Sequence, residues 1–250
     1  MDEAGALRGW SFRLAERLAA ARGGLLYANL ARRGATTREI VERQLARAIA
    51  MRPDLATVFS GTNDVLRPRF DARAFATDVL AIQRVLRAAG ATVVTFTLPD
   101  LSALIPLARP IAPRIRVMND AVRAACVATG TRLVDVAALP LATDARFWNE
   151  DRIHANPAGH ERIAAALSEA LGLPGTDGRW REPLPPVAPP GIATRAWREL
   201  RWSARYLAPW TLGAMFARGG RAFEGRRPEL APVTLSGAGS TVPGPIRSRR

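Results

Sequence analysis

The sequence predicts an α/β fold in which helices cover both faces of a mostly parallel sheet. Helix-like and strand-like segments alternate as far as about residue 172, which is the order that produces a parallel sheet. Most of the strand-like segments are nearly continuous in apolar character, as expected for strands that are covered on both faces. Capping patterns indicate where several of the helices begin and end.

Four short segments have the character of β-strands. They are LLYANL (25–30), ATVFSG (56–61), TVVTFTL (92–98) and TRLVDV (131–136). The last three are rich in Val, Thr and Phe, which favour a pleated, buried surface. Ligands of such folds bind beyond the carboxyl ends of the strands, so the residues that follow these segments are the first candidates for a site.

Five segments have apolar residues at helical spacing. They are WSFRLAERLAAA (10–21), TTREIVERQLARAIA (36–50), ARAFATDVLAIQRVLRAAG (72–90), RIRVMNDAVRAACVATG (114–130) and NPAGHERIAAALSEALG (156–172). The second opens with the capping box Thr36-x-x-Glu39, and Asp71 is placed to cap the third. In the fifth, Asn156 is the predicted N-cap and Pro157 the first helical residue.

The composition divides the chain into three parts. Residues 1–172 form the predicted domain, 173–192 a Pro-rich linker, and 193–250 a basic, aromatic tail that we expect to be partly disordered. The 250 residues contain no apolar run long enough to span a membrane. The first residues, MDEAGALRGW, lack the pattern of a signal peptide, so we expect a cytoplasmic protein.

The net charge of +14 comes from Arg alone, because Lys does not occur. Such a charge suits nucleic acid or an anionic membrane, but for the first 170 residues, where no basic cluster alternates with aromatic residues, we favour a genome of high GC content that encodes Arg in place of Lys. Nucleic acid is therefore an unlikely partner. The segment with Trp197, Trp202, Tyr206 and Trp210 allows packing on the domain, contact with a partner protein or peripheral contact with a membrane.

Two polar groups follow the predicted strands 25–30 and 56–61. In FSGTNDVL (59–66), Asn63 is able to donate an amide N–H to a developing oxyanion, and Asp64 to hold the loop by accepting backbone N–H groups. The alternative is an ordinary turn, in which Asn-Asp pairs are common. Gly34 offers an open backbone N–H near a capped helix, although a simple turn glycine is the commoner case.

Both histidines lie in NEDRIHANPAGH (149–160). Asp151 is three residues before His154, and a carboxylate beside a histidine is two thirds of a hydrolytic triad. His160 falls inside the predicted helix and is interpreted as structural. The single cysteine, Cys126, is interpreted as a core residue.

In this order the motifs resemble those of the SGNH, or GDSL-type, hydrolase family. Its blocks correspond to Gly34, to Gly61-Thr62-Asn63-Asp64 and to Asp151-Arg152-Ile153-His154, over about residues 9–172. The resemblance implies a flavodoxin-like fold and the hydrolysis of a small acyl ester through an acyl-enzyme. It implies that His154 is the base, that Asp151 orients it, and that Asn63 and the Gly34 amide bind the oxyanion.

The family's nucleophile is the serine of a Gly-Asp-Ser block on the first strand, and no Gly-Asp-Ser occurs in these 250 residues. Ser11 lies in the first helix pattern, Ser60 in a predicted strand, and Ser102 is the one surrogate with a plausible topology. We therefore expect the first strand and its serine to be missing, either upstream of an internal start codon or through true loss. In a sheet without that strand, segments 25–30 and 56–61 must leave a gap or pair directly.

The expected function is that of a serine esterase without metal or cofactor, since no cluster of Cys, His and carboxylates has metal-ligand spacing. An alternative is a catalytically inactive module of the same fold that binds a carbohydrate or a lipid. A weaker alternative is a nucleic-acid binder that works through the basic tail.

Overall fold

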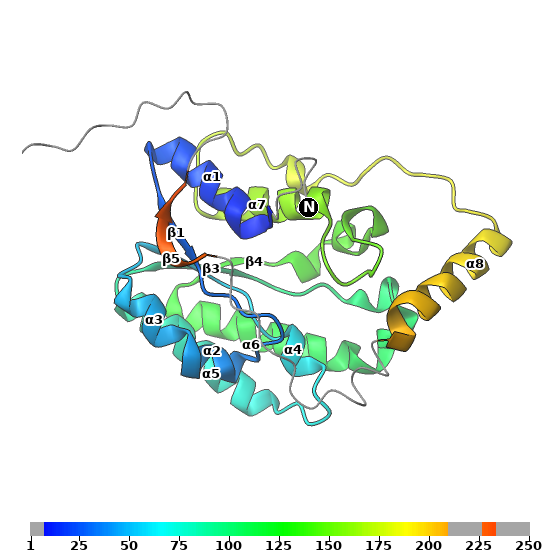
Figure 1. Cartoon of the computed structure of the whole chain (residues 1–250), viewed down its shortest axis with the longest axis horizontal. Coiled ribbons are helices and arrows are strands. Elements are labelled where there is room, and N and C mark those ends of the chain that lie inside the picture. Colours follow the sequence, from blue (N-terminus) through cyan, green and yellow to red (C-terminus); the bar gives the residue numbers. More distant parts are fainter. Residues whose placement is uncertain (1–7, 210–226, 234–250) are drawn as a thin grey trace, which may run out of the picture.

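The computed structural model describes residues 8–209 and 227–233 (Figure 1). Its central sheet is parallel, in the order β2-β3-β4, and consists of β2 (Leu55–Val58), β3 (Thr92–Phe96) and β4 (Arg132–Val134). In its register, Leu55 lies opposite Thr92 and Val94 opposite Arg132. The predicted α/β fold is confirmed, although each strand ends two or three residues before the predicted segment does.

All five predicted helical segments form, the segment 36–50 as two helices, whereas the helices at residues 62–65 and 192–202 were not predicted. In the described ranges the helices are α1 (Trp10–Arg22), α2 (Thr37–Arg43), α3 (Leu45–Ala50), α4 (Thr62–Val65), α5 (Ala72–Ala88), α6 (Ala112–Thr129), α7 (Pro157–Ala170) and α8 (Ile192–Trp202). The Thr36 side chain accepts from the Glu39 N–H while the Glu39 carboxylate accepts from the Thr36 N–H. The Asp71 and Asn156 side chains also accept N–H bonds of the helices that follow them, so the three predicted N-caps are confirmed.

Helices cover both faces of the sheet (Figure 1). α1 and α7 lie on one face, and α2, α3, α5 and α6 on the other. Adjacent residues of β3 face opposite layers: Val93 packs with Ile82 and Leu86 of α5, and Val94 with Leu14 of α1 and Leu167 of α7. Val93 and Val94 are completely buried, and burial of each stabilises the fold by roughly 1.5–3 kcal/mol relative to exposure.

The first predicted strand forms, but outside the parallel sheet. β1 (Leu26–Asn29) pairs antiparallel with β5 (Arg227–Pro232), with Leu26 opposite Pro232 and Tyr27 opposite Ala231. Segments 25–30 and 56–61 were expected either to leave a gap or to pair directly. In the structure β1 and β2 do not pair with each other. β5 was not predicted, because its prolines argue against a strand; at an edge they are tolerated, since one side of the strand needs no ladder N–H.

The end of the chain is described only in part. The predicted disorder of residues 234–250 lies outside the described residues, as do residues 210–226 with Trp210. From the linker onward, the described chain contains a short 3-10 turn, η6 (Arg179–Arg181), then extended residues and α8, which continues into the π-helical turn η7 (Ser203–Leu207). None of the helices in the described ranges has the length and apolar content that crossing a bilayer requires.

Candidate active site

The loop that carries Asp151 and His154 is held at both ends. Three 3-10 turns lead to it from β4: η3 (Val136–Ala138), η4 (Pro140–Thr143) and η5 (Ala145–Phe147). An isolated antiparallel bridge joins Trp148 to Ala155, and the Asn149 N–H donates to the His154 carbonyl at 2.8 Å. Asn156 then caps α7. The loop is thus a short closed turn anchored on a helix, which fixes the direction of its side chains.

Asp151 and His154 form a hydrogen-bonded pair. His154 Nδ1 lies 2.7 Å from Asp151 Oδ2, while Asp151 Oδ1 accepts the backbone N–H groups of Ile153 and His154, each at 3.0 Å. Arg152, between them, has a positive φ of 61°, a strained conformation for a residue with a side chain. One carboxylate oxygen is therefore fixed by the backbone, and the other faces the imidazole.

The electrostatics of the pair suit a general base. Burial raises the pKa of the Asp151 carboxyl, but hydrogen bonds from the His154 and Ile153 N–H groups and from the imidazole outweigh this effect, so that the pKa lies below its ordinary value. The ionised carboxylate favours the imidazole tautomer with the proton on Nδ1. The His154 side chain is 67% exposed, and within the described chain its Nε2 has no hydrogen-bond partner, which leaves that nitrogen able to accept a proton.

The Gly61–Asp64 turn lies beyond the end of β2. Gly61 has a φ of 110°, and a Cβ at this position would overlap the Met118 side chain, so both the backbone and the packing require glycine. Asn63 Nδ2 donates to the Ala35 carbonyl at 2.9 Å. The Asp64 carboxylate accepts the N–H and the hydroxyl of Thr37 at 3.0 and 3.1 Å, which confirms its predicted role of holding the loop.

Asn63, Asp64 and Gly34 form a second group of residues, apart from the Asp151–His154 pair. Burial raises the pKa of Asp64 above its ordinary value, against the opposing effect of the hydrogen bonds from Thr37. Gly34 has a φ of 78° with open space around it, so its backbone conformation, not close packing, favours glycine. In the described ranges the Gly34 N–H has no acceptor. The structure thus joins Asn63 and Asp64 to the 34–37 loop.

Two predicted groups therefore follow parallel strands: Asn63 after β2, and Asp151 with His154 after β4. The Gly34 loop follows β1, which lies outside the parallel sheet, and reaches Asn63 through the Ala35 carbonyl. No hydrogen bond or ion pair joins the two groups within the residues that the structure describes. Each is held by its own network, and the roles expected of Gly34, Asn63, Asp151 and His154 in one reaction stay predictions.

His160 has a structural role. Its Nδ1 accepts the N–H of Trp10 at 3.2 Å, at the first turn of α1. Burial, with a smaller contribution from the positive charge of Arg13, lowers its pKa to about 4. Through this hydrogen bond, the neutral imidazole of His160 joins α7 to the first turn of α1. The prediction that His160 is structural agrees with this contact.

The other candidate nucleophiles are placed differently. Ser60 lies beyond β2, not inside a strand as predicted, because β2 ends at Val58. Ser102 lies in η1 (Leu101–Ala103), where its N–H donates to Asp100 Oδ1. Across the described residues, no serine hydroxyl is hydrogen-bonded to His154. Burial raises the pKa of the Cys126 thiol, which lies among core side chains, so Cys126 is a core residue as predicted.

Sequence reasoning missed Arg152. Its guanidinium donates to the Leu104 carbonyl at 3.0 Å, pairs with both oxygens of Glu199 at 2.8 and 2.6 Å, and lies 4.7 Å from the centre of the Trp202 ring. Arg152 thereby connects the Asp151–His154 loop to α8 and to the segment after β3. The sequence contains no signal for this beyond the position of Arg152 between Asp151 and His154.

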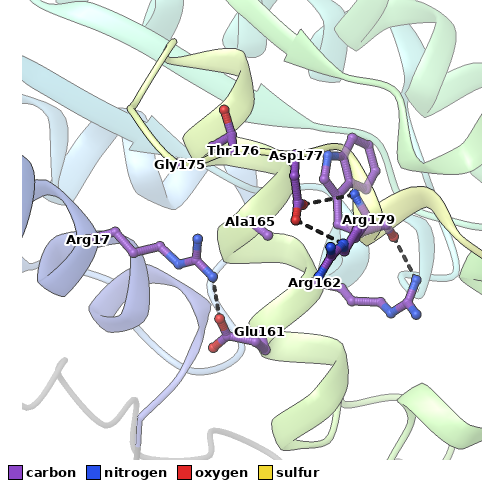
Figure 2. A pocket seen from close by; sticks show the side chains of 9 residues that line it. Arg17, Glu161, Arg162, Ala165, Gly175, Thr176, Asp177 and Arg179 are labelled. Atoms are coloured by element: carbon purple, nitrogen blue, oxygen red, sulfur yellow. Dashed lines mark hydrogen bonds and ion pairs between the residues drawn. The ribbon is translucent and has the colours of Figure 1, made fainter.

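A cavity of about 320 Å³ lies elsewhere, beside α1, α7 and η6 (Figure 2). Its arginines are already engaged: Arg17 pairs with Glu161, Arg162 donates to the Trp180 carbonyl, and Arg179 pairs with Asp177. His154 does not line it, so we place the candidate site at the strand ends and not in this cavity. In the described ranges, no three His, Cys, Asp or Glu side chains gather where they could hold a metal ion.

Comparisons with known proteins identify the family and the fold. The sequence profile of the GDSL-like Lipase/Acylhydrolase family matches residues 2–162. Among solved structures, the chain is similar to an acetylxylan esterase from Geobacillus stearothermophilus, with 17% identity, coverage of 68% of this chain and 84% of that one, and a TM-score of 0.54. It is similar to a psychrotrophic esterase from Pseudoalteromonas sp., with 19% identity, coverage of 68% and 90%, and a TM-score of 0.54.

A third similar structure is an α/β hydrolase enzyme from the metagenome of Lake Arreo, Spain. The identity is 20%, the match covers 66% of this chain and 81% of that one, and the TM-score is 0.53. At such identities the structural likeness establishes the fold alone. A search of the curated proteins finds no match.

Proposed function

The chain belongs to the GDSL-like lipase/acylhydrolase family, and from this premise we propose that it hydrolyses acyl esters with His154 as the general base and Asp151 as its orienting partner. One observation carries the proposal. The imidazole Nδ1 lies 2.7 Å from a carboxylate oxygen whose neighbour is fixed by two backbone N–H groups, and Nε2 is exposed. This is the geometry that a hydrolytic base requires.

In the proposed reaction, Nε2 of His154 takes the proton of a serine hydroxyl as the serine oxygen forms a bond to the acyl carbon. The carbonyl electrons move to oxygen, and the second N–H of the Asn63 amide and the Gly34 N–H stabilise that oxyanion. When the intermediate collapses, the bond to the alcohol breaks and Nε2 returns the proton to the leaving oxygen. Water then repeats the sequence on the acyl-enzyme and releases the acid.

We also propose that none of the serines among the described residues is the nucleophile. The hydroxyl of Ser11 is engaged by Tyr27 and that of Ser168 donates to the Ala164 carbonyl. Ser102, the one surrogate with a plausible topology, is not hydrogen-bonded to His154 in the described structure. The absence of Gly-Asp-Ser from the 250 residues supports the same proposal.

The substrate class is proposed from the family and from the similar structures. Two of the similar proteins are an acetylxylan esterase and an esterase, and we infer that this chain, too, takes small acyl esters. The candidate oxyanion donors are uncharged N–H groups, which suit the negative oxygen of a tetrahedral ester adduct.

The test measures hydrolysis of p-nitrophenyl acetate and p-nitrophenyl butyrate by two proteins. One is the 250-residue chain, and the other is the same gene read with any in-frame codons upstream of Met1. We expect the 250-residue chain to hydrolyse no faster than its denatured form. In a product that contains a Gly-Asp-Ser block, we expect hydrolysis, and His154→Ala to lower kcat/KM by about 10³- to 10⁶-fold.

His160→Asn is the matched control, since Asn Oδ1 still accepts the Trp10 N–H, and its kcat/KM should change little. Equal losses from both substitutions in folded proteins would mean that the base is wrongly assigned. Strong hydrolysis by the 250-residue chain that Ser102→Ala abolishes would make Ser102 the nucleophile. If every form is folded but inactive on a broad panel of esters, a binding module for a carbohydrate or lipid becomes the better function.

A further inference from the structure

α8 projects from the molecule and contacts it mainly near its C-terminal end. Every residue from 192 to 201 is exposed, and Trp202 is the first buried one. Figure 1 shows the helix at one side of the molecule, after the extended segment that leads away from η6. A helix of 11 residues is marginal in water without packing along its length. Among the described residues, its exposed face therefore has no packing partner of the kind that usually stabilises a short helix.

One side of α8 and η7 docks on the domain. Trp202 packs with Leu101, Leu104 and Ile105, and Glu199 is paired with Arg152. The Tyr206 hydroxyl donates to Glu150 at 2.9 Å. Because Glu150 and Arg152 belong to the Asp151–His154 loop, the helix is fixed directly to the candidate active site.

Three large apolar side chains of α8 are exposed. Ile192 is 87% exposed, Leu200 70% and Trp197 59%. With about 3.6 residues per turn, Ile192, Ala196 and Leu200 follow one another along one stripe, and Trp197 lies next to it. Exposed apolar side chains that form a stripe on one helix indicate a surface of interaction, whereas single ones do not.

Arginines occupy much of the remaining surface of the helix, and Arg201 lies next to Trp197. Arg195, Arg198, Arg201 and Arg205 are exposed, and Arg201 lies 5.2 Å from the centre of the Trp197 ring. Glu199, the one acidic residue between 192 and 209, is neutralised by Arg152. Within the described residues, the exposed surface of α8 thus presents apolar side chains, one tryptophan and arginines without an acidic partner.

We propose that α8 binds the surface of an anionic lipid bilayer, with Ile192, Trp197 and Leu200 inserted at the interface and the arginines on lipid phosphates. Charge complementarity selects this occupant: a helix with an apolar stripe and arginines on its remaining surface matches a surface that is apolar below and negative above. Tryptophan prefers the same boundary, and arginine side chains extend to phosphates while their stems stay apolar. Binding here places the bilayer beside the His154 loop; hydrolysis of membrane-derived esters at that position rests on the proposed function.

The experiment is co-sedimentation of the full chain with phosphatidylcholine vesicles, with and without phosphatidylglycerol. We expect binding to the anionic vesicles alone, weakened by high salt because exposed charges are screened. Arg198→Gln with Arg201→Gln should weaken binding by about 10- to 30-fold, at roughly fivefold for each arginine. Trp197→Ser with Leu200→Ser should weaken it by at least about tenfold.

Matched controls lie on other helices. Val127→Ser removes an apolar side chain that is 88% exposed on α6, and Arg73→Gln with Arg84→Gln removes two exposed charges from α5; neither should change vesicle binding. Circular dichroism and thermal unfolding establish that each variant is folded. The assay measures binding, so it is independent of whether the chain hydrolyses esters.

Three outcomes overturn the proposal. The first is failure to bind anionic vesicles, and the second is binding that the Trp197/Leu200 double substitution leaves unchanged. The third comes from sedimentation velocity without lipid: a dimer that this double substitution dissociates assigns the stripe to a second copy of the chain.

Discussion

At the scale of single residues, the two histidines differ in what their rings contact. His154 is exposed and faces a carboxylate, whereas His160 is largely buried and faces a helix N-terminus. The same residue type, six positions apart, is suited to proton transfer in one place and to packing in the other. Each environment has a consequence that is measurable without turnover.

Asp151→Asn should change the tautomer of His154. The Ile153 and His154 N–H groups hold one Asp151 oxygen, so an Asn keeps its oxygen there and turns its NH₂ group toward Nδ1. That group is a donor, and the imidazole must then carry its proton on Nε2. The loss of the correct tautomer costs about 10⁴-fold in a serine protease triad.

The ¹⁵N chemical shifts of the His154 ring, recorded where the imidazole is neutral, give the tautomer directly. We expect Nδ1–H in the unsubstituted protein and Nε2–H in the variant. An unchanged tautomer would show that Asp151 does not orient the base.

His160 should make the stability of the fold depend on pH. Its folded-state pKa of about 4 lies below the ordinary value of roughly 6.5, so between these values the unfolded chain binds more protons than the folded one. The contribution of His160 to the free energy of unfolding is therefore fully present above about pH 6.5. It is lost as the pH is lowered toward 4, and the loss is about 1–2 kcal/mol after allowance for partial exposure. Urea unfolding across this range measures the slope.

His160→Asn keeps the acceptor for the Trp10 N–H and removes the titration. The part of the slope that belongs to His160 is the difference between the two proteins. Identical slopes in both would contradict the assignment.

At the scale of elements, the Gly61 turn depends on a residue without a side chain. Gly61→Ala should lower the free energy of unfolding by about 2–4 kcal/mol, because it combines backbone strain at a positive φ with overlap of the Met118 side chain. Gly23→Ala is the control: its φ is 79° but nothing lies within 4 Å of an added Cβ, so about 1 kcal/mol of strain is expected. Chemical denaturation measures both, and equal losses would mean that the contact with Met118 is unimportant.

At the scale of the whole molecule, β5 joins the end of the chain to its beginning. Val233 is buried against Ala15 and Ala19 of α1, and β5 supplies the ladder partners of β1. A chain that ends at residue 226 should therefore be less stable, by about 1–3 kcal/mol, than one that ends at Val233. Amide exchange at Tyr27 should also become faster in the shorter chain, and equal exchange in the two chains would contradict the pairing.

The sequence alone determined the elements of the domain and the chemistry of the candidate residues. Apolar periodicity and caps are local properties, so α1, α5, α6 and α7 begin and end within a few residues of the prediction. The Asp151–His154 pair was predicted from the spacing of the two residues, and the turn in which Asp151 accepts the Ile153 and His154 N–H groups brings them together.

Contacts between distant segments were decided only by the tertiary structure. In the sequence, the residues of β5 have the character of a proline-rich tail. They form a strand because they pair with β1, some 200 residues earlier. In the sequence, Arg152 has the character of an ordinary loop arginine. It contacts Glu199 and Trp202 because α8 docks beside the Asp151–His154 loop. Such pairings depend on which surfaces the fold brings together, and local sequence patterns contain no information about partners that are far away along the chain.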